Sequence, residues 1–162
     1  MPSSPEHVPD WHLRPAVEDD RAFVFDVVRL TMREYIDRTW GWDDAWQREH
    51  FAAVFDARVL SIIVVEDEDA GVLEVYRNLD ALYLANIQVL PRFQSRGVGA
   101  DIIRGLMERA QALGVPMTLQ VLKANPDARR LYQRLGFAMT GETATHWKMV
   151  ASGGGTEALR PA

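Results

Sequence analysis

Gln94-Ser95-Arg96-Gly97-Val98-Gly99 lies between an apolar segment and an amphipathic segment, and this arrangement decides the predicted fold. The preceding run, Leu82–Leu90, is rich in aliphatic and β-branched residues and stops at Pro91, which is typical of a strand. After it, apolar residues recur at helical spacing from Val98 to Leu113, and Gly114 favours a helix end. The two glycines are therefore predicted at a strand-to-helix turn. Free backbone N–H groups and the positive end of the helix dipole make such a turn an anion cradle, most naturally for phosphate.

The residues after the turn narrow the class of phosphate ligand. A P-loop needs Lys and then Ser or Thr after its last glycine, but Ala100 and Asp101 follow Gly99. The dinucleotide fingerprint needs a third Gly or Ala where Ile102 stands. A nucleoside triphosphate and a nicotinamide or flavin dinucleotide are therefore both disfavoured, and the pattern that remains is Gln-x-x-Gly-x-Gly.

A second motif follows between Leu119 and Phe137, with the sequence LQVLKANPDARRLYQRLGF. It predicts a strand and then a short helix, with Asn125 as N-cap, Pro126 at the first helical position and Gly136 as the C-terminal stop. The residues expected on the buried face of this helix are Ala128, Leu131 and Leu135.

The two motifs, in this order and separation, resemble two conserved blocks of the GNAT superfamily of N-acetyltransferases. The first resembles its acetyl-coenzyme A pyrophosphate loop. The second matches its Asn, Ala, Leu-Tyr and Gly-Phe positions, and the resemblance covers about residues 60 to 150. It implies an α/β (α+β) fold with a mixed central β-sheet of about six to seven strands, helices on both faces and splayed strands at the acetyl-coenzyme A site.

The remaining segments fit that fold as one domain over residues 11–150, between a flexible N-terminal segment at 1–10 and a flexible, glycine-rich tail at 151–162. A first strand precedes a helix that is expected to run to about Arg38, and Asp43 or Asp44 is placed to cap a second helix. The later pieces are strands at 59–65 and 72–76 around a charged turn at 66–71, and closing strands at 138–141 and 146–150.

Composition excludes several other classes of protein. The chain has 162 residues, no cysteine and a formal net charge of -5, so disulfides, thiolate metal sites and a cysteine nucleophile are excluded and a nucleic-acid surface is disfavoured. No stretch approaches the ~20 apolar residues of a membrane span. The interpretation is a cytoplasmic monomer or homodimer that needs no metal.

The resemblance implies acetyl-coenzyme A as co-substrate and a set of residues that contact it. Backbone groups of the strand before the turn are expected to pair with the pantetheine arm, with an N–H at or beside Val89 polarising the thioester carbonyl. Arg96 is expected to contribute its backbone N–H. The full set of expected cofactor contacts is Ile87, Gln88, Val89, Gln94, Ser95, Arg96, Gly97, Val98, Gly99, Ala100, Asn125, Ala128 and Tyr132.

The resemblance also implies an N-acetyltransferase that transfers acetyl to a primary amine of a small molecule or peptide by direct attack in a ternary complex. It is thus an acyltransferase for groups other than aminoacyl groups. Tyr132 matches the family tyrosine that faces the sulfur and is expected to act as general acid. Many members carry a Glu base where Ala85 stands. Three alternatives stay open: a base elsewhere, with Glu34 ahead of Glu74 and His146, a water relay, or an amine that arrives partly neutral.

Three tryptophans, Trp40, Trp42 and Trp46, gather at the connection of the first two helices, which borders the acceptor site in this family. Glu34 and Trp42 are the expected acceptor-binding residues, Trp42 through cation–π attraction to an amine, whereas Trp46 is expected to staple the helices to the sheet. Two other functions stay open. The chain could be a catalytically weakened acyl-coenzyme A-binding sensor or partner module, which Ala85 favours, or a structural protein whose glycines only turn the chain.

Overall fold

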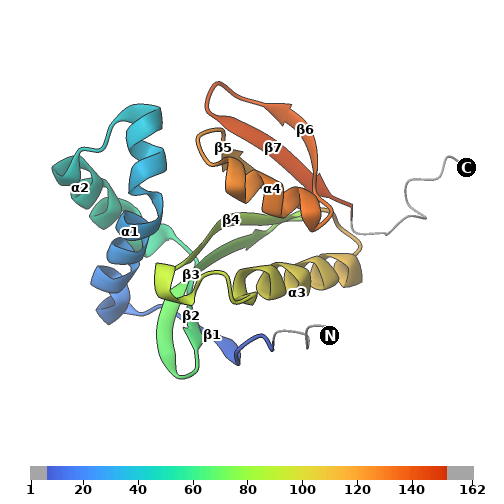
Figure 1. Cartoon of the computed structure of the whole chain (residues 1–162), viewed down its shortest axis with the longest axis horizontal. Helices are drawn as coiled ribbons and strands as arrows, with labels where there is room; N and C mark the ends of the chain where they lie inside the picture. Colours follow the sequence, from blue (N-terminus) through green and yellow to red (C-terminus); the bar gives the residue numbers. More distant parts are fainter. Residues whose placement is uncertain (1–6, 153–162) are drawn as a thin grey trace, which may run out of the picture.

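A computed structural model of the chain describes residues 7–152 (Figure 1) and contains one seven-stranded sheet in the order β1-β2-β3-β4-β5-β7-β6. The strands are β1 Trp11–Pro15, β2 Leu60–Val65, β3 Glu68–Arg77, β4 Leu82–Val89, β5 Met117–Leu122, β6 Ala138–Glu142 and β7 His146–Ala151. The α-helices are α1 Arg21–Trp40, α2 Asp44–Val54, α3 Val98–Leu113 and α4 Pro126–Arg134, with short 3-10 turns η1 Glu18–Asp20, η2 Phe55–Ala57 and η3 Pro91–Phe93. The fold class, the element order and the strand number confirm the expectations from the sequence.

Helices cover both faces of the sheet, and each face has its own apolar core. Ile63, Leu82 and Leu84 pack with α3 residues such as Ile102 on one face. On the other face, Ile62 and Val72 pack with Val24 of α1 and with residues of α2. Neighbouring residues of β2 are thus buried on opposite faces, which explains the continuous apolar run of this strand.

The sheet opens between β4 and β5, its only parallel pair. These strands are paired over only three positions, Leu82–Leu84 against Met117–Leu119. Beyond Leu84, β4 keeps its antiparallel partner β3 but has no partner on the β5 side within the described chain. The register of β3 against β4 shifts between Glu74 and Val75, so Ala85 is the extra residue of a β-bulge in β4. The expected strand splay is confirmed.

Two element boundaries differ from the sequence prediction. The charged turn expected at residues 66–71 is limited to Glu66 and Asp67, both of which have positive φ, and β3 already begins at Glu68. A two-residue turn with positive φ at both positions matches the twist of a β-hairpin, so the strands extend further than their charges suggested. The first helix also continues to Trp40, two residues beyond the expected end, until Gly41 with φ of 82° stops it.

The ends of the chain are described only in part. Residues 1–6 and 153–162 lie outside the described residues, so the expectations of a flexible start and tail are not addressed there. From residue 7 onward, Val8 packs beside the turn before α3, and the Asp10 carbonyl accepts from the Glu66 N–H at 3.0 Å. None of the helices between residues 7 and 152 has the length and hydropathy that a bilayer crossing needs.

Candidate active site

A cleft of about 620 Å³ opens where β4 and β5 separate. Its walls come from four places: the end of β4, the turn and first residues of α3, the helix α4, and one side of α1. Twelve of the thirteen expected cofactor contacts line it, namely Ile87, Gln88, Val89, Gln94, Ser95, Gly97, Val98, Gly99, Ala100, Asn125, Ala128 and Tyr132. Residues that are more than thirty positions apart in the sequence therefore meet at one cavity.

The end of β4 offers unpaired backbone groups to this cleft. The Leu90 N–H donates to the Ala70 carbonyl of β3 at 2.8 Å, and successive residues of a strand point their backbone groups to alternate sides. The N–H groups of Val89 and Ile87 therefore face the open side, and their expected pairing with a pantetheine arm stays a prediction. The Val89 carbonyl on that side is already occupied, because it accepts from the Gln94 side-chain amide at 2.7 Å.

The turn before α3 leaves the helix N-terminus uncovered. Ser95 has φ of 61° and Gly97 has φ of 85°, which is the left-handed region that favours glycine at the second position. No side chain of the described residues caps α3, so its first N–H groups have neither an intrahelical nor a side-chain acceptor. A Cβ built on Gly99 would meet no protein atom within 4 Å, so the missing side chain leaves open space beside the cleft.

The charged side chains near the turn, Asp101 and Arg96, interact with residues from other parts of the chain. The Asp101 carboxylate in the first turn of α3 accepts from the Trp11 indole N–H at 2.7 Å, so this negative charge near the uncapped helix start already has a protein partner. Arg96 does not line the cleft, and its guanidinium lies 3.5 Å from the Glu66 carboxylate. The expected backbone contact at Arg96 stays a prediction.

Asn125 takes the N-cap position of α4 that the sequence assigned to it. Its side-chain oxygen accepts from the Ala128 N–H at 3.2 Å, and Pro126 is the first helical residue. The side-chain N–H₂ of Asn125 has no partner among the described residues and is free to donate to a ligand. No residue of α4 is fully buried, whereas Ala128, Leu131 and Leu135 were expected to be; they are half-buried, and the first two line the cleft.

Tyr132 lies on the cleft side of α4. Its ring packs edge-on against Phe137, with 5.8 Å between ring centroids, and its hydroxyl makes no hydrogen bond to the described residues. Burial raises the pKa of Tyr132 to about 12, because the charged phenolate is poorly solvated there. The hydroxyl therefore stays protonated at neutral pH and is available as a donor.

None of the three base candidates lines the cleft. Glu34 lies on the exposed side of α1 and forms an ion pair with Arg38 at 2.5 Å. Glu74 is buried. Burial alone would raise its pKa, but hydrogen bonds from Arg58, Tyr76 and Asn86 outweigh this and hold the pKa below its ordinary value.

The third candidate, His146, contacts the Thr145 hydroxyl at 2.8 Å, and burial lowers the pKa of its imidazole. Within residues 7–152, Asp127 provides the only carboxylate that lines the cleft, and it is paired with Arg130. No group of three or more potential metal ligands occurs in the same part of the chain.

The tryptophans occupy positions of three kinds. Trp42 is half-buried against the α1–α2 core, does not line the cleft, and has the Arg33 guanidinium 5.5 Å above its ring. Trp46 was expected to pack the helices against the sheet. It is instead 55% exposed and stacks on His50, with 4.7 Å between ring centroids. Trp46 lies in the first turn of α2, where its backbone N–H donates to the N-cap Asp43 at 2.9 Å, and the way α2 lies on the sheet turns its indole towards solvent. Trp40 is 60% exposed and lies 6.1 Å from His146 between ring centroids.

The structure adds cleft residues that the sequence did not single out for ligand binding. Thr31, Met32 and Tyr35 line the cleft from α1. Gln88 was already among the expected cofactor contacts, and the structure shows that its side chain lines the cleft and is 7% exposed. The available signal for it was a polar residue at a buried position of an apolar strand.

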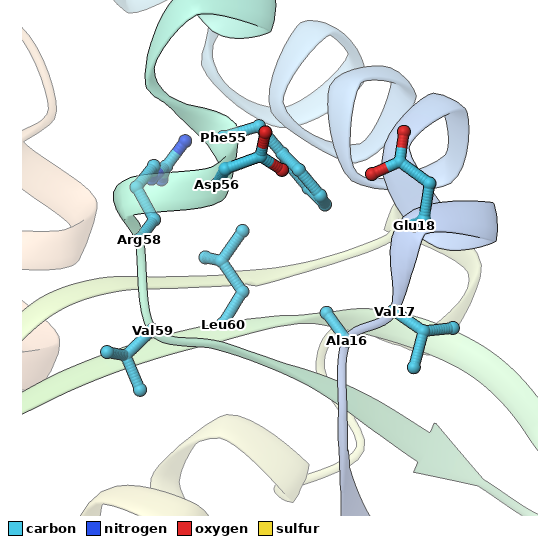
Figure 2. A pocket seen from close by; sticks show the side chains of 8 residues that line it. All are labelled: Ala16, Val17, Glu18, Phe55, Asp56, Arg58, Val59 and Leu60. Atoms are coloured by element: carbon cyan, nitrogen blue, oxygen red, sulfur yellow. The ribbon is translucent and has the colours of Figure 1, made fainter.

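A second cavity of about 360 Å³ lies at the start of β2 (Figure 2), lined by Ala16, Val17, Glu18, Phe55, Asp56, Arg58, Val59 and Leu60. Its charged groups already have protein partners. Glu18 and Asp56 both pair with Arg21, and Arg58 pairs with Glu74. This cavity therefore offers no unpaired charge to a ligand, and the cleft at β4 and β5 is the better candidate.

Comparison with known proteins agrees with the fold. The model of the acetyltransferase (GNAT) family matches residues 24–137. A [ribosomal protein bS18]-alanine N-acetyltransferase from Salmonella typhimurium is 31% identical over 94 residues, which is 57% of this chain and 64% of that protein. The match thus spans less than two thirds of the relative's length.

Two solved structures share the fold over nearly their whole length. The PaiA N-acetyltransferase from Thermoplasma acidophilum, in complex with coenzyme A, has a TM-score of 0.70 at 12% identity and covers 88% of this chain and 99% of its own. The ribosomal-protein-S18-alanine N-acetyltransferase from Escherichia coli has a TM-score of 0.65 at 18% identity, with coverage of 90% and 95%. Since the family model matches well over half of its residues, this chain belongs to the acetyltransferase (GNAT) family.

Proposed function

We propose that this chain is an acetyl-coenzyme A-dependent N-acetyltransferase that acts on a primary amine. One observation carries the proposal: a single cleft combines a free strand edge, an uncapped helix N-terminus and the buried hydroxyl of Tyr132. The helix N-terminus suits a diphosphate, the strand edge suits the amide groups of a pantetheine arm, and the hydroxyl suits a leaving sulfur.

In the proposed reaction, the amine nitrogen attacks the thioester carbonyl carbon while both ligands are bound. A C–N bond forms, the C–S bond breaks, and the amine loses one proton. The Val89 N–H, on the open side of β4, donates to the carbonyl oxygen as it gains negative charge. No covalent intermediate on the protein is needed.

The role assigned to Tyr132 is to donate its hydroxyl proton towards the sulfur as the thiolate leaves. Its raised pKa of about 12 keeps the donor protonated over the whole neutral range. The same burial keeps water away from the developing charge, which strengthens the interaction.

For the amine proton, we propose release through water to Glu34. Glu34 adjoins Tyr35 and lies one helical turn from Thr31, and both of these residues line the cleft. The Glu34 carboxylate is exposed to solvent, so it can exchange protons with bulk water. Trp42, two residues beyond the end of α1, is proposed to shape the acceptor side.

Two measurements test this function. Calorimetric titration with acetyl-coenzyme A should show one site per chain, and a chain that binds none at millimolar ligand would exclude both an enzyme and a sensor. Release of free thiol should then be followed across a panel of amines, including a peptide with a free α-amino group on alanine, chosen from the name of the Salmonella relative. Thiol release that depends on one class of amine supports the proposal.

The alternative is a catalytically weakened acyl-coenzyme A-binding sensor or partner module. The observation that favours it is the absence of an unpaired carboxylate from the cleft walls within residues 7–152, together with Ala85 at the β4 bulge. Tight binding of acetyl-coenzyme A without amine-dependent thiol release would select this alternative.

A further inference from the structure

A chain of buried and half-buried polar side chains runs from Arg58, just before β2, to the cleft on the α1 side of the sheet. The Arg58 guanidinium donates to both oxygens of Glu74, at 2.8 and 3.1 Å. The Asn86 amide donates to Glu74 Oε1 at 2.6 Å, and the Gln88 amide donates to Asn86 Oδ1 at 2.9 Å. Glu74 lies opposite Asn86 in the β3–β4 register, so these side chains share one face.

The charge on Glu74 fixes which way each amide points. A carboxylate held ionised by Arg58 only accepts hydrogen bonds, so Asn86 must present its N–H₂ to Glu74. The Oδ1 of Asn86 then faces Gln88 and must receive an N–H₂ as well. Gln88 is therefore left with its Oε1 as the free end of the chain.

The Oε1 atom of Gln88 is a buried hydrogen-bond acceptor without a donor in the described part of the chain. Gln88 is 7% exposed, its Oε1 has no hydrogen-bond partner among the described residues, and the side chain lines the cleft. Buried acceptors of this kind are rare because leaving one unpaired costs stability. Ile87 and Val89 pack towards the α3 core, so Gln88 reaches the opposite side of the strand, where Thr31 and Tyr35 of α1 form the wall.

We propose that Gln88 Oε1 binds the attacking amine by accepting one of its N–H groups, with Arg58, Glu74 and Asn86 as positioning residues that set its polarity. This assignment rests on the proposed acetyltransferase function and names the group that selects its acceptor. It predicts a nucleophile that carries at least two N–H bonds when neutral, one held by Gln88 and one lost in the reaction. Primary amines meet this requirement, whereas a secondary amine has one N–H bond and an alcohol has none.

The test uses the full chain with Gln88→Met, which keeps the length of the side chain and the β4 backbone but removes the acceptor. Tyr76→Phe is the control, because it removes a donor from the same Glu74 carboxylate while Arg58 still holds the charge. Steady-state rates are measured with the best primary amine of the panel, and acetyl-coenzyme A affinity by calorimetry.

The expected result is a rise of tenfold or more in the amine KM of Gln88→Met, with acetyl-coenzyme A Kd within twofold of wild type and with Tyr76→Phe unchanged in both. An unchanged amine KM in Gln88→Met overturns the assignment. Wild-type chain that binds acetyl-coenzyme A but acetylates no amine overturns the proposed function instead, and the assignment with it.

If Gln88→Met does not fold, the contact between Gln88 and the amine can be tested by NMR of the wild-type chain. With coenzyme A bound, so that no turnover occurs, the side-chain N–H₂ signals of Gln88 should shift when the same amine is added. Signals that stay in place at saturating amine overturn the assignment.

Discussion

Gly99→Ala separates ligand binding from stability, because the protein itself has room for the added methyl group. A Cβ at Gly99 meets no protein atom within 4 Å, and the residue lines the cleft at the start of α3. Gly105 of the same helix is a matched control: its Cβ would also meet nothing within 4 Å, and it does not line the cleft.

Both substitutions should stabilise the fold slightly. Replacing Gly by Ala within a helix is worth about 0.5–1 kcal/mol, which corresponds to a rise in Tm of about 1–4 °C for a chain of this size. The gain in stability at Gly99 should be the smaller of the two, because Gly99 is the second residue of α3 and the helix restricts its backbone less than that of Gly105.

Only Gly99→Ala should weaken the binding of acetyl-coenzyme A. The methyl group occupies the space through which a diphosphate approaches the α3 amides, and each hydrogen bond to a charged group is worth about 1.5–3 kcal/mol. Loss of one such bond raises Kd by about 10- to 100-fold. Calorimetric titration of the two variants measures this difference. Equal Kd values in Gly99→Ala and Gly105→Ala would refute the placement of the diphosphate.

Three further changes test other parts of the account. Tyr132→Phe should lower kcat about 100-fold with little change in acetyl-coenzyme A Kd. Because the pKa of Tyr132 is raised to about 12, the kcat of the wild-type chain should not fall through loss of the Tyr132 proton as the pH rises to 10. A fall in kcat centred near pH 10 that disappears in Tyr132→Phe would contradict this. Glu74→Gln should cost about 3 kcal/mol in urea unfolding at neutral pH, since it leaves Arg58 without its charge partner. Because the pKa of Glu74 is lowered in the fold, its stabilisation is present above about pH 4.3 and is lost as pH falls; a variant with the same acid sensitivity as wild type would argue against the ion pair. Gly71→Ala should lower the free energy of unfolding by about 1–3 kcal/mol and also weaken acetyl-coenzyme A binding, because the added Cβ would lie 2.2 Å from the Gln88 carbonyl oxygen and push β4 aside. Unchanged binding would show that β4 tolerates the shift.

The parts of the fold that the sequence predicted are those with strong local signals. The turn before α3 has Gly97 in the left-handed region, and the start of α4 has the N-cap Asn125 followed by Pro126, each where the sequence predicted it. The charged turn before β3 was overestimated, because Glu68 and Asp69 pair with β2 although their side chains suggest a loop.

The acceptor side of the cleft could not be predicted in the same way. The convergence of Glu74, Asn86 and Gln88 depends on the register of β3 against β4 and on the bulge at Ala85, neither of which has a sequence signal. The exposure of Trp46 depends similarly on how α2 lies on the sheet. Tertiary placement, and not local propensity, decides both features.

The most direct test of the central claim is an amide NMR titration of the wild-type chain with coenzyme A. The account predicts that the largest shifts fall on the free β4 amides of Ile87 and Val89 and on residues 95–100, while Gly105 stays in place. Shifts centred on the cavity at the start of β2, or no shift at the turn before α3 at millimolar ligand, would contradict it.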